Sequence, residues 1–177
     1  MQPWSDVSVP ALNLHPVEFQ VFDSKSDKLK PLPTSGIAKL YVCGITPYDA
    51  THMGHAATYV AFDTLNRFWQ AIGVEVQYAQ NITDIDDPLL ERAKLTSRAW
   101  EDIATEQIDL FKADMVALRV LPPQNYIGVV ESMELIEQSA VKLQELGVAY
   151  SVENDLYFDM THTDLLGEIC HLTKAGR

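Results

Sequence analysis

The sequence predicts an α/β fold built around a mainly parallel β-sheet. Between residues 37 and 79, an apolar strand-like run, an amphipathic segment with helical spacing and a second strand-like run follow one another. A strand, a helix of about twenty residues and a second strand form a βαβ unit, whose two strands are parallel. Further helical segments and a final strand continue this alternation. We therefore expect a layered domain with the order β-α-β-α-α-α-β.

The first βαβ unit is defined by apolar runs and by the residues that interrupt them. The first core strand is expected at Ile37–Cys43, because Gly44–Pro47 breaks the apolar run there. Apolar residues recur three and four positions apart from about Met53 to Ile72, which predicts a helix, and Gly73 stands where a C-terminal cap belongs. Strand character returns at Val74–Ala79.

The second half of the chain is predicted to be mostly helical. We expect helices at residues 89–95, 98–117 and about 126–146, a stop at Pro122-Pro123 and a last strand at Leu156–Met160. The third of these helices has an apolar stripe, which is expected to pack in the core. This stripe consists of Val129, Met133, Ile136, Ala140 and Leu143.

The N-terminal segment differs from the rest because it is rich in proline. Five of the nine prolines fall within the first 33 residues, and proline can neither donate to a β-ladder nor continue a helix. Residues 1–36 are therefore predicted to form an extended arm with at most one short strand near Phe19–Phe22. The folded body is expected to span residues 37–177.

Composition narrows the class of protein. At 47% hydrophobic and 21% charged residues, the chain is too apolar for intrinsic disorder. Two cysteines are too few for a disulfide framework and suit a reducing compartment, so we expect a cytoplasmic protein. No apolar run reaches the roughly 20 residues that cross a bilayer, and Met1–Asp6 lacks the features of a signal peptide, so no membrane role is expected.

The net charge of −12 argues against nucleic acid as a general partner. The chain has 13 basic and 25 acidic residues, so the surface as a whole cannot neutralise phosphates. The negative charge is unevenly distributed along the chain. Residues 1–80 contain 7 acidic and 5 basic residues, which gives a net charge of −2 and leaves a net charge of −10 for residues 81–177. A polyanionic ligand would be repelled least by the first half.

The segment from Tyr41 to Ala56 has the character of a phosphate-binding turn. It leads from a strand end to a helix N-terminus, where free N–H groups and the helix dipole favour anions. His52 and His55 add imidazole donors, and Gly54 between them lets a base or ribose approach the backbone. No Gly-x-Gly dinucleotide fingerprint and no Gly-Lys-Ser/Thr phosphate loop occurs.

Three separated blocks resemble class I aminoacyl-tRNA synthetases. The tetrad His52-Met53-Gly54-His55 resembles their "HIGH" signature. Tyr-Val-Cys-Gly at 41–44 and Asn-Ile-Thr-Asp-Ile-Asp-Asp at 81–87 narrow the resemblance to the cysteine-activating branch. The resemblance implies a Rossmann-like nucleotide-binding core, of which residues 37–177 would be the incomplete N-terminal part.

Two families of that branch fit to different degrees. Cysteinyl-tRNA synthetases commonly carry Val, Arg and Lys where this chain has Pro47, Ala57 and Pro88. Residues 44–58 and 86–93, with the opening Met-Gln-Pro-Trp-Ser, instead resemble the mycothiol-pathway ligases, which join cysteine to glucosaminyl-inositol. The resemblance runs to about residue 160, whereas that family is about twice as long and has a later "KMSKS"-type loop.

The chemistry implied by the resemblance is ATP-dependent activation of L-cysteine to cysteinyl-adenylate, followed by attack of the glucosaminyl-inositol amine. In-line attack at the α-phosphate needs positioned groups that spread negative charge, such as helix N–H groups, imidazoles and Mg²⁺. His52 and His55 are accordingly assigned to the ATP phosphates; the alternative is that they cap or pack the helix. The chain by itself is expected to be an inactive, monomeric portion of the ligase.

Cys43 is, by resemblance, a zinc ligand. Zinc would accept the thiolate of substrate cysteine and so distinguish it from serine. The remaining ligands would lie downstream, so we expect this chain to bind zinc weakly or not at all. Cys43 could also be a small buried hydrophobe, and Cys170 and His171 match no family block.

Further contacts to the cysteinyl-adenylate are also implied by resemblance only. Thr83 could instead cap the following helix. The three acidic residues Asp84, Asp86 and Asp87 lack the further ligands of a calcium loop, so solvation and helix N-terminal charge are expected for them. The residues implied to contact the adenylate are Gly44, Ile45, Thr46, Gly54, Thr58, Asn81, Ile82 and Thr83.

Two alternatives to the ligase stay open from sequence. The chain could be part of a cysteinyl-tRNA synthetase, or a non-catalytic nucleotide-binding domain. The expected partners of the ligase are the small molecules L-cysteine, ATP and glucosaminyl-inositol, without nucleic acid or membrane.

Overall fold

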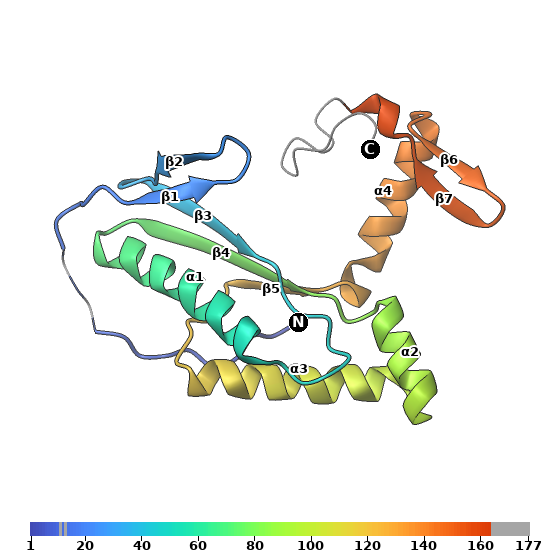
Figure 1. Cartoon of the computed structure of the whole chain (residues 1–177), viewed down its shortest axis with the longest axis horizontal. Coiled ribbons are helices and arrows are strands. Elements are labelled where there is room, and N and C mark those ends of the chain that lie inside the picture. Colours follow the sequence, from blue (N-terminus) through green and yellow to red (C-terminus); the bar gives the residue numbers. More distant parts are fainter. Residues whose placement is uncertain (11, 13, 164–177) are drawn as a thin grey trace. The chain divides into compact units, whose positions relative to one another are not determined.

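The computed structural model describes residues 1–10, 12 and 14–163 (Figure 1). The chain groups into two compact units. The first contains Met1–Val17 and Pro33–Ser132, and the second contains Glu18–Leu32 and the chain from Met133 onward. Within the described residues, no helix is both long and apolar enough to cross a membrane. Cys170 and His171, which were considered for zinc, lie outside the described residues.

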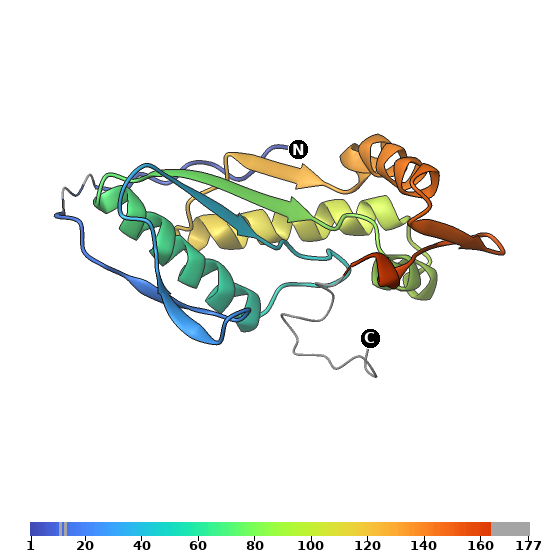
Figure 2. The same ribbon diagram turned by 90° about the horizontal axis from the view of Figure 1, so that it is seen from above.

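The core of the first unit is a three-stranded parallel sheet. Strands β3 (Ile37–Val42), β4 (Glu75–Ile82) and β5 (Asn125–Gly128) lie in the order β3-β4-β5. Both pairs are parallel, with Ile37 opposite Glu75 and Ala79 opposite Asn125. The predicted mainly parallel α/β sheet is therefore confirmed, and the C-terminal ends of all three strands meet at one edge (Figure 2).

Helices cover one face of this sheet. Residues of β3 alternate between exposed and buried, with Ala38, Leu40 and Val42 buried, as expected when one face is covered. Helices α1 (Met53–Ala71) and α3 (Trp100–Ala117) pack on that face (Figure 1). They contact each other through Tyr59 and Phe111, whose ring centroids lie 5.0 Å apart.

The helix predicted at 126–146 begins later than expected, because its first residues form a strand. Residues of β5 pair with β4, and Tyr126 and Gly128 are buried with a period of two. After the short 3₁₀ turn Val130–Ser132, helix α4 spans Met133–Glu145. The predicted core stripe is also wrong, since α4 has no buried residue and Ile136 is 45% exposed. Pairing of the β5 backbone with β4 has outweighed the local helical spacing.

The proline-rich N-terminal segment is more structured than predicted. It contains two strands, β1 (Gln20–Asp23) and β2 (Lys28–Pro31), paired as an antiparallel hairpin. The hairpin turn is stabilised by the Asp23 carboxylate, which accepts hydrogen bonds from the backbone N–H and hydroxyl of Ser26. Further upstream, Trp4 is buried and donates its indole N–H to the carbonyl of Val120 at 2.8 Å.

The remaining elements differ from prediction mainly at their ends. Helix α2 spans Asp87–Thr96, and Ser97 ends it in the left-handed conformation with φ of 53°. In the second unit, β6 (Ala149–Val152) and β7 (Asp155–Phe158) form an antiparallel hairpin, followed by a 3₁₀ turn at Met160–His162. One strand was predicted in this region, and β6 was missed.

Candidate functional site

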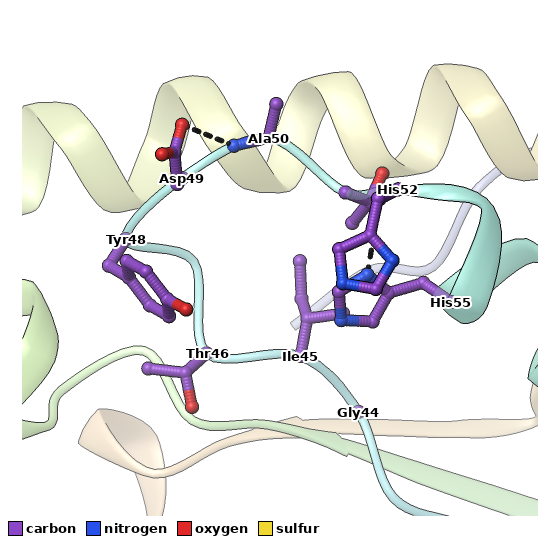
Figure 3. Close-up of a pocket in the computed structure, with 9 residues that line it drawn as sticks. Gly44, Ile45, Thr46, Tyr48, Asp49, Ala50, His52 and His55 are labelled. Atoms are coloured by element: carbon purple, nitrogen blue, oxygen red, sulfur yellow. Dashed lines mark hydrogen bonds between the residues drawn. The ribbon is translucent and has the colours of Figure 1, made fainter.

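A pocket lies where β3 leads into α1, at the C-terminal edge of the parallel sheet. Its volume is about 300 Å³, and both imidazoles of the His52–His55 tetrad contribute to its wall (Figure 3). Open parallel sheets bind ligands at this edge. The lining residues are Gly44, Ile45, Thr46, Tyr48, Asp49, Ala50, Thr51, His52 and His55.

The start of the loop is held against the end of β4. The Gly44 N–H donates to the side-chain oxygen of Asn81 at 2.9 Å, and the Thr83 N–H donates to the Ile45 carbonyl at 3.0 Å. A Cβ on Gly44 would overlap the backbone carbonyl of Asn81, so only glycine allows the two segments to approach this closely. These contacts fix the floor of the pocket.

His52 and His55 cap helix α1 reciprocally. His52 is the N-cap residue, and its Nδ1 accepts a hydrogen bond from the Gly54 N–H at 3.0 Å. The Nδ1 of His55 accepts from the His52 N–H at 3.2 Å (Figure 3). The two ring centroids lie 4.2 Å apart. The alternative that these histidines cap the helix is thus correct, but capping uses only one nitrogen of each ring.

The capping hydrogen bonds determine which nitrogen carries the proton. A neutral imidazole has one donor and one acceptor, so a ring whose Nδ1 accepts has its N–H on Nε2. Each ring can therefore cap through Nδ1 and donate from Nε2 to a ligand in the pocket. Burial, and secondarily the neighbouring His52, lower the pKa of His55 and so favour its neutral form. With the helix dipole, these donors make an environment suited to phosphate oxygens.

Cys43 stands beside the pocket but without a metal site around it. It is an exposed free cysteine, so it is not the small buried hydrophobe considered as its alternative. The Tyr59 hydroxyl donates to its backbone carbonyl at 3.1 Å. In residues 1–10, 12 and 14–163, no three His, Cys, Asp or Glu side chains gather to hold a metal ion. The described residues therefore do not fit a zinc site.

The other predicted ligand-binding residues divide into two groups. Asn81 and Thr83 do not line the pocket but hold its loop, because the Asn81 side chain accepts from the Gly44 N–H and the Thr83 N–H donates to the Ile45 carbonyl. Helix α2 is capped by the Asp86 side chain, so Thr83 is not its cap. Ile82 is fully buried and Thr58 is exposed on α1 with its hydroxyl donating to the Gly54 carbonyl, so neither side chain lines the pocket.

The acidic residues after β4 have structural roles. Asp84 is buried, contrary to the expectation of solvation, and its carboxylate accepts from the Val130 N–H at 3.0 Å. Asp86 caps α2 and Asp87 lies in its first turn, as predicted.

Four pocket residues were not singled out from sequence: Tyr48, Asp49, Ala50 and Thr51. They lie inside the block at 44–58 that carries the resemblance, so their position between two singled-out groups was the available signal.

Comparison with known proteins agrees with this geometry. Residues 29–175 match the family described as "tRNA synthetases class I (C) catalytic domain". An L-cysteine:1D-myo-inositol 2-amino-2-deoxy-alpha-D-glucopyranoside ligase of Kribbella flavida is 50% identical over 171 residues, covering 96% of this chain and 42% of that protein. The ligase of the same name from Catenulispora acidiphila is 48% identical, and the match covers 97% of this chain and 41% of that protein. The chain thus spans about two-fifths of the length of these relatives, and the resemblance to the ligases is confirmed.

Solved structures show the same fold at low identity. Mycobacterium tuberculosis methionyl-tRNA synthetase in complex with methionyl-adenylate aligns with a TM-score of 0.57 at 21% identity, over 63% of this chain and 23% of that one. A leucyl-tRNA synthetase from Agrobacterium radiobacter K84, in a ternary complex, aligns with a TM-score of 0.54. The alignment covers 63% of this chain and 15% of the synthetase. The chain belongs to the class I (C) family of tRNA synthetase catalytic domains.

Proposed function

We propose that this chain is the ATP-binding portion of a ligase that joins L-cysteine to the amine of glucosaminyl-inositol. The proposal is supported by identities of 44 to 50% to ligases of that name and by the pocket at the strand ends. Within the cell, we place this ligase in the cytoplasm.

One observation carries the assignment of the pocket to ATP. His52 and His55 use Nδ1 to cap α1, which assigns an N–H to each Nε2 in the wall of the pocket. Two imidazole N–H donors beside a helix N-terminus can stabilise the negative charge that develops on a phosphate.

The proposed reaction has two steps. First, a carboxylate oxygen of cysteine attacks the α-phosphorus of ATP, the bond to the β-phosphate oxygen breaks, and magnesium pyrophosphate leaves. Second, the sugar amine attacks the carbonyl carbon of the adenylate, the bond to the phosphate oxygen breaks, AMP leaves and the amine loses a proton. In the first step, His52 and His55 donate to phosphate oxygens, and the Gly44–Thr46 backbone borders the site of the adenylate. Asn81 and Thr83 hold that backbone in place through their hydrogen bonds to Gly44 and Ile45.

No step is assigned to zinc, because among the described residues Cys43 does not belong to any group of side chains that could hold a metal ion.

The main competing function is that of a cysteinyl-tRNA synthetase, which shares the family. Two of the three positions that distinguish the ligases have a visible structural role. Pro47 is fully buried in the pocket loop, and Pro88 lies at the start of α2, where proline is well tolerated. The third, Ala57, is exposed on α1.

The test is cysteine-dependent ATP–pyrophosphate exchange by the complete protein, followed by product formation with either glucosaminyl-inositol or tRNA. We expect exchange with cysteine but not serine, and product only with the amino sugar. Charging of tRNA instead would assign the protein to the synthetases, and ATP binding without exchange would make it a non-catalytic nucleotide-binding protein. We expect no exchange by the 177-residue chain alone, because its ligase relatives are more than twice as long.

A further inference from the structure

A single hydrogen bond joins the pocket loop to helix α3. The hydroxyl of Thr51 donates to the Asp114 carboxylate at 2.9 Å, although the two residues are 63 positions apart in sequence. Thr51 is the residue directly before the N-cap His52, and both residues line the pocket. Asp114 lines a second hollow of about 370 Å³, whose wall also includes Thr51 and His52.

The position of Asp114 on its helix is unfavourable for the helix itself. It lies in the last turn of α3, where the dipole is negative and cations rather than carboxylates are stabilising. The side chain is half-buried, so its charge is only partly solvated. An aspartate at position 114 therefore does not stabilise α3 itself. Its role in the structure is to accept the hydrogen bond from Thr51.

Thr51 is coupled to both imidazoles through the backbone of His52. The His52 N–H donates to Nδ1 of His55, and the His52 ring accepts from Gly54. The position of the Thr51–His52 peptide therefore decides whether both capping bonds form. These two bonds in turn decide that the proton of each ring is on Nε2.

We propose that Asp114 is a positioning residue, whose carboxylate holds Thr51 and thereby keeps the His52 and His55 rings in the Nε2–H form at the pocket. Asp114 acts through Thr51 and the capping bonds and touches no ligand.

The direct test is the tautomeric state of the two histidines in the 177-residue chain, measured by two-bond ¹H–¹⁵N NMR at a pH at which both rings are neutral. Resonances are assigned with H52N and H55Q. We expect both rings in the Nε2–H form in the wild type and mixed tautomers in T51V and D114A, which lose the hydrogen bond. T51S and D114N retain a hydroxyl or an oxygen acceptor and should behave like the wild type.

Asp109→Ala is the matched control, because Asp109 is an exposed aspartate on the same helix. If T51V and D114A keep the wild-type tautomers, or if D109A changes them equally, Asp114 has no positioning role. Mixed tautomers in the wild type would also overturn the proposal. Loss of α3 is not the expected outcome, since alanine is a better helix former than aspartate.

A second readout rests on the proposed function. In the complete ligase, D114A and T51V should lower kcat for cysteine-dependent exchange by about tenfold to a hundredfold. The KM for cysteine should be unchanged, and D114N should restore kcat. If the wild-type protein shows no exchange, the proposed function fails, whereas the tautomers still decide the role of Asp114. Unchanged kcat in both variants of an active enzyme would refute the positioning role.

Discussion

The two roles assigned to His52 and His55, capping α1 and donating to a phosphate, can be separated by substitution. Asparagine is among the best N-cap residues, and glutamine at the third helical position completes a capping box. H52N and H55Q therefore preserve the capping function while removing the imidazole Nε2–H groups. H52A removes both functions, which makes it the matched comparison.

The loss of a helix cap and the loss of a phosphate donor are expected to differ in magnitude. Loss of an N-cap side chain costs about 1 kcal/mol, which lowers the melting temperature of a chain of this size by about 2–4 °C. We expect this decrease in H52A and little change in H52N or in H52N/H55Q. A hydrogen bond to a charged group contributes about 1.5–3 kcal/mol, so each lost Nε2–H donor should weaken ATP binding about tenfold to a hundredfold.

The assay pairs thermal unfolding, followed by circular dichroism, with isothermal titration of Mg-ATP into each variant of the complete protein. We expect H52N/H55Q to keep the wild-type melting temperature but to bind ATP more weakly. H52A should have a lower melting temperature and should also bind ATP more weakly. If H52N/H55Q binds ATP as tightly as the wild type, the histidines serve only as caps, and the assignment of the pocket to phosphate is wrong.

Three further predictions concern pH and packing. Because the pKa of His55 is lowered in the folded chain, its neutral form stabilises the fold above the unfolded pKa of 6.5. This contribution should be lost as pH falls from 6.5 toward the folded pKa, so thermal unfolding should show the wild type losing stability relative to H55Q there. Gly44→Ala should destabilise by about 1–3 kcal/mol or more, measured by urea unfolding, because its Cβ would overlap the Asn81 carbonyl; wild-type stability would contradict this. Trp4→Ala should cost about 3–5 kcal/mol, since the ring is buried and its N–H is bonded to Val120; a loss below about 1 kcal/mol would show that the N-terminal segment is not part of the core.

The elements that the sequence predicted well are those with local signals. Helix α1 has helical spacing along its length, a capping residue at His52 and Gly73 at its end, where φ is 79°. Strands β3 and β4 flank this helix as apolar runs, and a helix of this length between two strands is typical of the crossover that parallel strands need. Each of these features depends on residues close in sequence.

The elements that were missed depend on distant partners. Residues 125–128 form a strand because β4 is there to pair with them, and nothing in their own spacing opposes a helix. Trp4 is buried through contacts with Phe111 and Tyr126, more than a hundred positions away. The apolar stripe of α4 has helical spacing without burial, so periodicity predicted the helix but could not show whether a core lies against it.

The same limit applies to the site. The histidines, Gly44 and Asn81 could be singled out because they lie in blocks with a known resemblance. The sequence could not predict that Nδ1 of each ring caps the helix, because this depends on the side-chain rotamers. The contact between Thr51 and Asp114 joins two segments that share no local pattern.

The geometry of the tetrad explains why three of its four positions are restricted. Serine and glutamate would form an equally good capping box, but glutamate has no donor, and the serine O–H is on the same atom that accepts the capping bond. Imidazole instead has its acceptor and its donor on two separate nitrogens of one rigid ring. Gly54 lies under the His52 ring, and a Cβ there would come within 2.8 Å of its Cε1 atom. Met53 is 82% exposed and faces no such restriction. The pattern His-x-Gly-His is thus what a helix N-terminus requires if its caps are also to donate to an anion, and the free second position follows from the same geometry.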